Sequence, residues 1–154
     1  MRILVFSDSH GTFNKMKKAI EEQTESKDII FCGDGEREID RAKELFPDKN
    51  FYCVRGNNDY VLNFPYTSII ELENKKIMFT HGHGYGVKSS LDDLIFSAKS
   101  NNVDIVIFGH THIAHRDYID GLHILNPGSC GYFYSSFATI DIINTQIVTN
   151  IIML

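Results

Sequence analysis

The chain of 154 residues is short of cysteine and of long apolar runs. Its three cysteines, Cys32, Cys53 and Cys130, are odd in number and widely spaced, which favours buried, reduced thiols over zinc ligands or a disulfide. No stretch approaches the roughly 20 apolar residues that span a bilayer. The apolar start, residues 1–6, is too short for a secretory signal and leads directly into Asp8. We therefore expect a cytoplasmic protein with no membrane partner.

Positive charge is also scarce. The sequence has 15 lysines and arginines against 20 aspartates and glutamates, a net charge of -5 at pH 7. This sign is wrong for a protein that grips long nucleic acid through its phosphates, and the one basic stripe is a helix face with Lys15, Lys17 and Lys18. We expect no nucleic-acid partner, whereas a small anionic substrate drawn in by metal charge is compatible with the composition.

What the sequence does contain is a regular alternation of apolar strands and amphipathic helices. With 43% hydrophobic residues, it has the make-up of one globular domain, residues 1–154. The first third predicts strands at 2–7, 28–32 and 51–54, with a helix at 13–25 that Thr12 or its neighbours could cap and a helix at 36–46 that Pro47 stops. This β-α-β-α-β series favours a parallel sheet with right-handed crossovers.

The remainder of the chain is richer in strands. A hairpin is predicted at 67–72 and 76–80, then a helix at 89–100 and a strand at 104–108. Strands at 113–119, 122–125, 137–143 and 146–152 follow, joined by turns at 120–121 and 144–145. The pattern predicts an α/β fold in which two mixed sheets pack together and helices flank them, a four-layer α-β-β-α sandwich.

Metal-competent side chains follow five of the apolar runs. Each run ends among small turn-forming residues, so these side chains should gather at one rim of a sheet, where open α/β sheets bind ligands. Carboxylate, imidazole and amide ligands without a thiolate suit divalent ions such as manganese, iron, nickel or zinc. Their number is sufficient for two ions. The candidates are Asp8 and His10 in FSDSH, Asp34 in FCGDG, Asn57 in VRGNND, His81 in FTHGH, and His110 with His112 in FGHTH.

Each segment also has a structural explanation when it is taken alone. Asp8 could cap a helix, Asp34 could form a simple Asp-Gly turn, and Asn57 could lie in an ordinary loop. The histidine pairs of FTHGH and FGHTH fit such explanations less well, because imidazoles beside glycine are costly to bury unpaired. A centre with two metal ions accounts for all five segments at once.

The five segments resemble, in the same order, the signature blocks D-x-H, G-D, G-N-x-[DE], H and G-H-x-H of the calcineurin-like metallophosphoesterase superfamily. The short length, the strand-rich end and residues 126–129 are similar to its small prokaryotic branch, the YfcE-like phosphodiesterases. The resemblance implies the metallo-dependent phosphatase fold, which is the sandwich predicted above. It also implies two divalent metal ions, with manganese expected first and nickel, iron or zinc as alternatives. In this pattern Asp8, His10 and His112 would hold one ion, Asn57, His81 and His110 the other, and Asp34 would bridge them.

The implied activity is that of a phosphodiesterase, which hydrolyses small phosphodiesters or activated phosphoesters by attack of a metal-bridging hydroxide. One catalytic position departs from the pattern, because Asn58 stands where many members carry histidine. An amide donates a hydrogen bond but no proton, so leaving groups that need no proton should be favoured. His83 could act as a replacement acid or be an exposed bystander, and Asp59 in the surrounding shell could pair with Arg55.

Two other functions remain open. The phosphoesterase-like subunit of retromer uses this fold as a non-catalytic scaffold for protein binding, although every ligand position of the present chain holds a competent residue. Double-strand-break nucleases share the five blocks but are longer and carry further DNA-binding parts. Tyr60, Tyr85 and residues 128–134 are expected to shape the substrate pocket, and the aromatic residues 131–134 could instead form the interface of a homo-oligomer. His115 and His123 are interpreted as structural.

Overall fold

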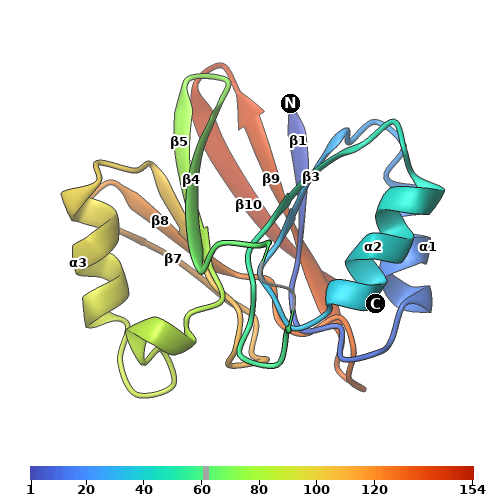
Figure 1. The fold of residues 1–154 in the computed structure, drawn as a ribbon. Helices are drawn as coiled ribbons and strands as arrows, with labels where there is room; N and C mark the ends of the chain where they lie inside the picture. The colour runs from blue at the N-terminus through green and yellow to red at the C-terminus, as the bar shows by residue number, and fades with distance from the viewer. Residues whose placement is uncertain (61–62) are drawn as a thin grey trace.

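Two five-stranded sheets face each other and helices cover their outer sides, as Figure 1 shows. The computed structural model describes residues 1–60 and 63–154. One sheet has the order β10-β9-β1-β2-β3 and carries α1 and α2, and the other has the order β4-β5-β6-β8-β7 and carries α3. The predicted four-layer α-β-β-α sandwich is confirmed. The elements are β1 (Arg2–Phe6), α1 (Asn14–Glu22), β2 (Asp28–Phe31), α2 (Glu36–Leu45), β3 (Asn50–Cys53), β4 (Thr67–Leu72), β5 (Lys75–Thr80), the 3-10 turn η1 (His83–Tyr85), α3 (Asp92–Ser100), β6 (Ile105–Ile107), β7 (His115–Ile119), β8 (Leu122–Asn126), β9 (Ser136–Ile143) and β10 (Gln146–Met153).

Both sheets are mixed, with their parallel strands at the centre or along one side. Strands β1, β2 and β3 are parallel, as are β5, β6 and β8, whereas β9, β10, β4 and β7 pair antiparallel. Parallel strands direct their carboxyl ends to one edge of a sheet. The loops that follow these strands therefore meet at the lower edge of the molecule as drawn in Figure 1.

Strand β1 explains how the layers are held together. Ile3 and Val5 face the second sheet and join the core between the sheets, while Leu4 and Phe6 face α1 and α2. Side chains alternate across a strand, so a strand buried on both faces is apolar throughout. This is why β1 has a continuous apolar sequence. A third apolar cluster lies under α3 and includes Leu94.

Several boundaries differ from the sequence predictions. Helix α1 ends at Glu22, short of residue 25, and Thr12 does not cap it, because its Oγ1 donates instead to the Gly131 carbonyl at 3.3 Å. Helix α3 begins at Asp92, since residues 86–90 form a turn in which the Ser89 amide donates to the Gly86 carbonyl at 2.8 Å. Among the described residues, no helix combines the length and apolar character needed to cross a bilayer.

Candidate metal centre

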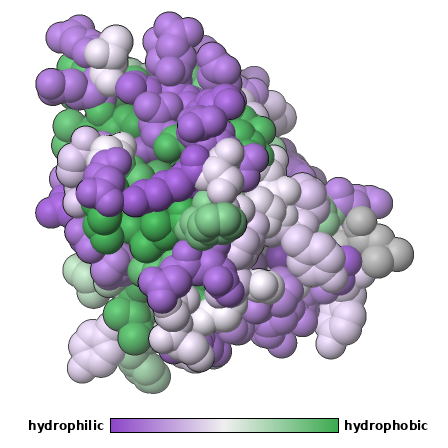
Figure 2. Space-filling view, turned by 90° about the vertical axis from the view of Figure 1, so that its left-hand side faces the viewer, coloured by the Kyte–Doolittle hydropathy of each residue, from purple (hydrophilic) through white to green (hydrophobic). Residues whose placement is uncertain are grey.

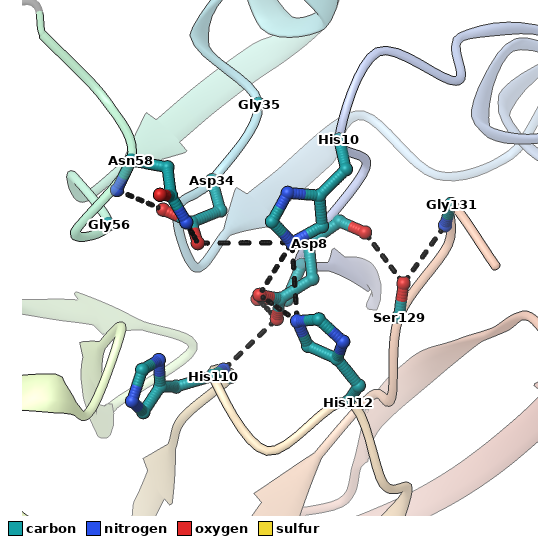
Figure 3. A network of polar contacts seen from close by, with 12 residues as sticks. Asp8, His10, Asp34, Gly35, Gly56, Asn58, His110, His112, Ser129 and Gly131 are labelled. Atoms are coloured by element: carbon teal, nitrogen blue, oxygen red, sulfur yellow. Dashed lines mark hydrogen bonds and ion pairs between the residues drawn. The ribbon is translucent and has the colours of Figure 1, made fainter.

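The seven predicted ligands converge at the rim formed by the strand ends. Asp8 and His10 follow β1 and Asp34 follows β2, while His110 and His112 follow β6 of the other sheet. Figure 3 shows the side chains of Asp8, His10, Asp34 and His112 directed toward one another from opposite sheets, and the backbone amide of His110 directed at Asp8. The two remaining candidates, after β3 and β5, lie next to them, as the distances below establish.

The first group is built around the Asp8 carboxylate. Its Oδ1 lies 3.1 Å from His112 Nε2 and 3.5 Å from His10 Nε2, and the two imidazole nitrogens are 3.2 Å apart. Ligand atoms that share one ion at bond lengths near 2.1 Å lie about 3.0 to 3.4 Å from each other. These three side chains are thus spaced as ligands of a single ion would be.

The second group is built around His81. Its Nε2 lies 3.1 Å from Asn57 Oδ1, 3.2 Å from His110 Nδ1 and 3.4 Å from Asp34 Oδ2. The same Asp34 oxygen lies 3.8 Å from His10 Nε2 of the first group. One carboxylate oxygen is therefore placed between the two groups, as a shared ligand would be.

The Asp8 carboxylate supplies a direct test of whether a cation fits here. Its Oδ2 accepts hydrogen bonds from Ser7 Oγ at 2.6 Å and from the His110 amide at 3.0 Å. Its Oδ1 is buried and makes no hydrogen bond within the described part of the chain. Its nearest polar neighbours are the imidazole nitrogens of His112 and His10, at 3.1 and 3.5 Å, and a buried ionised oxygen that accepts no hydrogen bond is costly. A divalent cation at the first group would satisfy it, so the residues fit a metal ion.

His81 is held in the orientation that a metal ligand needs. The ring is fully buried, and its Nδ1 lies 2.7 Å from the Cys32 carbonyl, to which it donates a hydrogen bond. This bond fixes the proton on Nδ1 and leaves the lone pair of Nε2 directed at the rim. The strand end of one sheet thereby orients a ligand from the other.

The two carboxylates are ionised at neutral pH. Burial opposes ionisation of Asp8, but the imidazoles of His10 and His112 hold its pKa well below the ordinary range. Burial opposes ionisation of Asp34 as well, but the neighbouring His81 and the two hydrogen bonds from Asn58 lower its pKa to about 2. Two negative charges therefore lie in a partly desolvated rim.

The imidazoles respond to the same surroundings in opposite ways. Burial, reinforced by the nearby His81, lowers the pKa of His110 to about 4, so this ring is neutral and can donate a lone pair. Asp8 raises the pKa of His10. Because metal ions bind the neutral ring, loading of the first group competes with a proton at His10 in mildly acidic solution.

Five of the candidate ligands also have a strained backbone. Asp8, His10, Asp34, His110 and His112 have φ angles of 56°, 43°, 60°, 65° and 60°. Left-handed conformations cost an ordinary residue about 1 to 2 kcal/mol and persist where the surrounding structure imposes them. The other non-glycine residues with positive φ in the described part of the chain lie in hairpin turns or just after α3. Outside these turns and the position just after α3, the described non-glycine residues with a left-handed backbone are therefore all candidate ligands.

Asn58 makes two hydrogen bonds to the carboxylate of Asp34, the ligand shared by the two groups. Its backbone amide donates to Asp34 Oδ1 at 2.8 Å and its side-chain Nδ2 donates to Asp34 Oδ2 at 2.7 Å (Figure 3). The sequence assigned Asn58 a catalytic position, and the geometry adds a positioning role that holds Asp34 toward both groups.

His83 lies beside the second group. Its ring centroid is 5.4 Å from that of His81 and 6.1 Å from that of His110, and within the described residues its buried Nδ1 has no hydrogen-bond partner. Burial and the neighbouring His81 lower the pKa of His83. A neutral ring is a weaker proton donor at neutral pH, so a catalytic role for His83 stays a prediction.

The prediction that Asp59 forms an ion pair with Arg55 is wrong. Arg55 donates to the backbone carbonyl of Asp59 at 3.4 Å, and its guanidinium lies over the Tyr66 ring at 4.8 Å. The Asp59 carboxylate instead accepts four backbone amides, those of Asp34, Gly35, Glu36 and Gly56, at 2.7 to 3.1 Å. It joins the loop after β2 to the loop after β3.

Replacing Asp59 with alanine should therefore destabilise the protein by about 3 to 5 kcal/mol, because four buried or part-buried amides lose a charged acceptor. In a thermal melt this corresponds to a fall of roughly 10 °C. Asp117→Ala is the control, since Asp117 is exposed on β7 and, among the described residues, its carboxylate accepts only the Tyr118 amide, at 2.7 Å. Similar melting temperatures for the two variants would contradict this role of Asp59.

Two residues of the segment 128–134, which was expected to shape the pocket, contact the candidate ligands directly, and the sequence analysis did not predict these contacts. Ser129 Oγ donates to the Asp8 carbonyl at 2.7 Å and accepts from the Gly131 amide at 3.1 Å (Figure 3). The Tyr132 ring stacks on His112 with centroids 5.0 Å apart and contacts His10 at 5.5 Å. The aromatic segment 131–134 was predicted to line a pocket or an interface. In the sequence, the feature nearest to it is the turn-forming stretch that precedes it, which predicts a loop but not the residues that the loop contacts. No spacing rule places it on the histidines.

Comparisons with known proteins agree with this geometry. The family pattern described as the calcineurin-like phosphoesterase superfamily domain matches residues 1–145. The probable metallophosphoesterase YsnB of Bacillus subtilis is 34% identical over 84% of this chain and 75% of its own, and the phosphodiesterase MJ0936 of Methanocaldococcus jannaschii is 29% identical over 95% and 94%. The crystal structure of a predicted phosphoesterase from Streptococcus pneumoniae TIGR4 superposes with a TM-score of 0.85 at 24% identity, covering 99% of this chain and 88% of that one. A match over nearly the whole length, together with a relative of this identity, shows that the chain belongs to the calcineurin-like phosphoesterase superfamily and to its small YfcE-like branch of metallophosphoesterases.

Proposed function

We propose that this chain is a phosphodiesterase that uses two divalent metal ions to hydrolyse small phosphodiesters or activated phosphoesters. The observation that carries the proposal is the pair of ligand groups that share Asp34 Oδ2, together with the buried oxygen of Asp8 that accepts no hydrogen bond from the described residues. A protein-binding scaffold would need neither the strained ligand backbones nor a buried carboxylate oxygen that accepts no hydrogen bond. The phosphodiesterase name of the archaeal relative supports the same activity.

Charge balance explains why such a site would attract a phosphoester. One ion would be held by Asp8, His10 and His112, and the other would be held by Asn57, His81 and His110. Both ions would be bound by Asp34. When bound, the ions supply Lewis acidity toward phosphoryl oxygens and lower the pKa of a coordinated water. The two carboxylates offset only half of the four positive charges, which leaves a surplus that favours an anionic substrate. Manganese is proposed first, with nickel, iron or zinc as alternatives, because the ligands are carboxylate, imidazole and amide groups.

The residues around the centre favour leaving groups that are stable as anions. In hydrolysis the oxygen of water forms a new bond to phosphorus and the bond from phosphorus to the leaving oxygen breaks. An alkoxide then needs a proton, whereas a nitrophenolate does not. Asn58 has no proton to give, and the lowered pKa of His83 makes that ring a poor donor at neutral pH.

Two hollows beside the centre favour a diester over a monoester. One, of about 210 Å³, is lined by His10, Asn58, Arg37 and Tyr60. The other, of about 380 Å³, is lined by Thr111, which lies between His110 and His112, by four apolar side chains, and by Lys88 and His115. A phosphodiester has two substituents, and each could enter one hollow while the phosphoryl group lies at the rim.

The proposal is tested with two chromogenic esters. After removal of metal with a chelator, hydrolysis of bis(p-nitrophenyl) phosphate should be lost, and added Mn²⁺ should restore it. The diester should be hydrolysed at least about tenfold faster than p-nitrophenyl phosphate, since the monoester leaves one hollow empty and this difference is worth about 1.4 kcal/mol. Unchanged hydrolysis after removal of metal would overturn the proposal, and a preference for the monoester would overturn its assignment to diesters.

A further inference from the structure

The larger hollow is an apolar groove that includes Thr111 of the loop carrying His110 and His112. The buried side chains of Val87 and Phe108 form its floor, and Leu91 and Ile113 form its sides. Its volume of about 380 Å³ lies in the range of small-molecule sites. Figure 2, which views the face that carries α3, shows hydrophobic surface on this side of the molecule.

The wall of the groove is continuous with the metal centre. Thr111 lines the groove and stands between His110 and His112 in the chain. Asn126 Nδ2 donates to Thr111 Oγ1 and to the Gly109 carbonyl, both at 3.0 Å, so that this wall is fixed relative to the ligands. A phosphoester held at the rim would therefore have one substituent next to the groove.

The residues that line the groove indicate which kind of substituent would bind there. Ile113 is 70% exposed at its edge, and the polar side chains among its lining residues are those of Lys88, Thr111 and His115. The smaller hollow, in contrast, contains Arg37 and carboxylates in addition to Asn58. Apolar area removed from water contributes about 25 cal/mol per Å², so a hydrocarbon group gains most from the larger groove.

We infer that this groove binds an apolar substituent of the phosphodiester, an alkyl group of several carbons, while the phosphoryl group lies at the metal centre. The inference rests on the proposed phosphodiesterase function and gives its substrate class. A mixed diester, with one apolar and one polar substituent, matches the two hollows.

The experiment uses the Mn²⁺-loaded enzyme and p-nitrophenyl alkyl phosphodiesters with methyl, ethyl, propyl and butyl groups. The leaving group is the same throughout, so differences report the alkyl site. We expect kcat/KM to rise about two- to fourfold for each added methylene. A flat or falling series overturns the inference. Absence of hydrolysis for every ester, the methyl ester included, contradicts the proposed function itself.

Two matched substitutions locate the effect. Ile113→Asn removes an exposed apolar side chain from the groove, and Phe96→Asn removes a 74% exposed one from α3 outside it. Both should fold, since surface changes of this kind stay within about 0.5 kcal/mol. In Ile113→Asn the increase in kcat/KM for each added methylene should be at most half of the wild-type increase. In Phe96→Asn it should equal the wild-type increase. An equal loss on all four esters in Ile113→Asn would overturn the assignment.

A second copy of the chain is the competing occupant of the groove. Light scattering on the wild type and on Ile113→Asn distinguishes the two. We expect the same molar mass for both proteins. A wild-type dimer that Ile113→Asn converts to monomer, with the chain-length series unchanged, would overturn the inference in favour of an interface.

Discussion

Replacing Asp34 with asparagine is expected to lower kcat/KM for a phosphodiester by at least about a thousandfold, equivalent to roughly 4 kcal/mol of lost transition-state stabilisation. Asp34 Oδ2 lies 3.4 Å from His81 Nε2 and 3.8 Å from His10 Nε2, so it is placed to serve both ligand groups. The substitution keeps the size of the side chain but removes one of two negative charges. Asn58 Nδ2 would then face an amide in place of a carboxylate.

The measurement combines kinetics with metal analysis of the protein after gel filtration. Asp34→Asn should retain at most one ion per chain where the wild type retains two. Asp28→Asn is the control, because Asp28 begins β2 at the end opposite the rim and accepts from Asn50 and Tyr52. That variant should keep its metal and its activity within about threefold, with some loss of stability. Equal kinetic losses in both variants, or two ions retained by Asp34→Asn, would contradict the role given to Asp34.

Replacing Gly56 with alanine is expected to reduce kcat/KM by about a hundredfold. A Cβ at Gly56 would collide with Oδ1 of Asp34 and lie 2.6 Å from both the Asp34 Cγ and its amide nitrogen. The φ of Gly56 lies outside the left-handed region, so the cost is steric and not conformational. The Asp34 carboxylate must move, and displacements near 1 Å in a reacting site cost about two powers of ten.

Gly84→Ala serves as the matched control for this effect. Gly84 lies in η1, where a Cβ would have no described atom within 4 Å, and its φ is also outside the left-handed region. Titration with Mn²⁺ should show weaker binding in Gly56→Ala and wild-type binding in Gly84→Ala. If Gly56→Ala bound Mn²⁺ as the wild type does, close approach of this loop would not be what positions Asp34.

Much of this architecture could be predicted because its signals are local. The apolar runs before Asp8 and His110 predicted strands, and parallel strands bring their carboxyl ends to a common edge. The convergence of the seven candidates follows from that edge, although whether each binds metal stays a prediction. Helix boundaries were less accurate, since the end of α1 and the start of α3 depend on which loop groups satisfy their terminal amides and carbonyls.

The partner of Asp59 could not be predicted in the same way. A carboxylate four residues from an arginine suggests a local ion pair. The loops after β2 and β3, however, present four amides to it, and these come from residues up to 25 positions away in sequence. Tyr132 illustrates the same limit, because its stacking on His112 depends on how the segment after β8 crosses the rim.

The sequence by itself determined the layers of the fold, the family and the identities of the candidate ligands, because strand periodicity and the order of the five short segments are encoded in neighbouring residues. Only the tertiary structure decided which oxygen of Asp8 accepts no hydrogen bond, which groups share Asp34, and that an apolar groove adjoins the His110–His112 loop. These features arise where two sheets meet. They depend on ångström-scale distances between segments that are remote in the chain, and those distances are set by packing of the whole core.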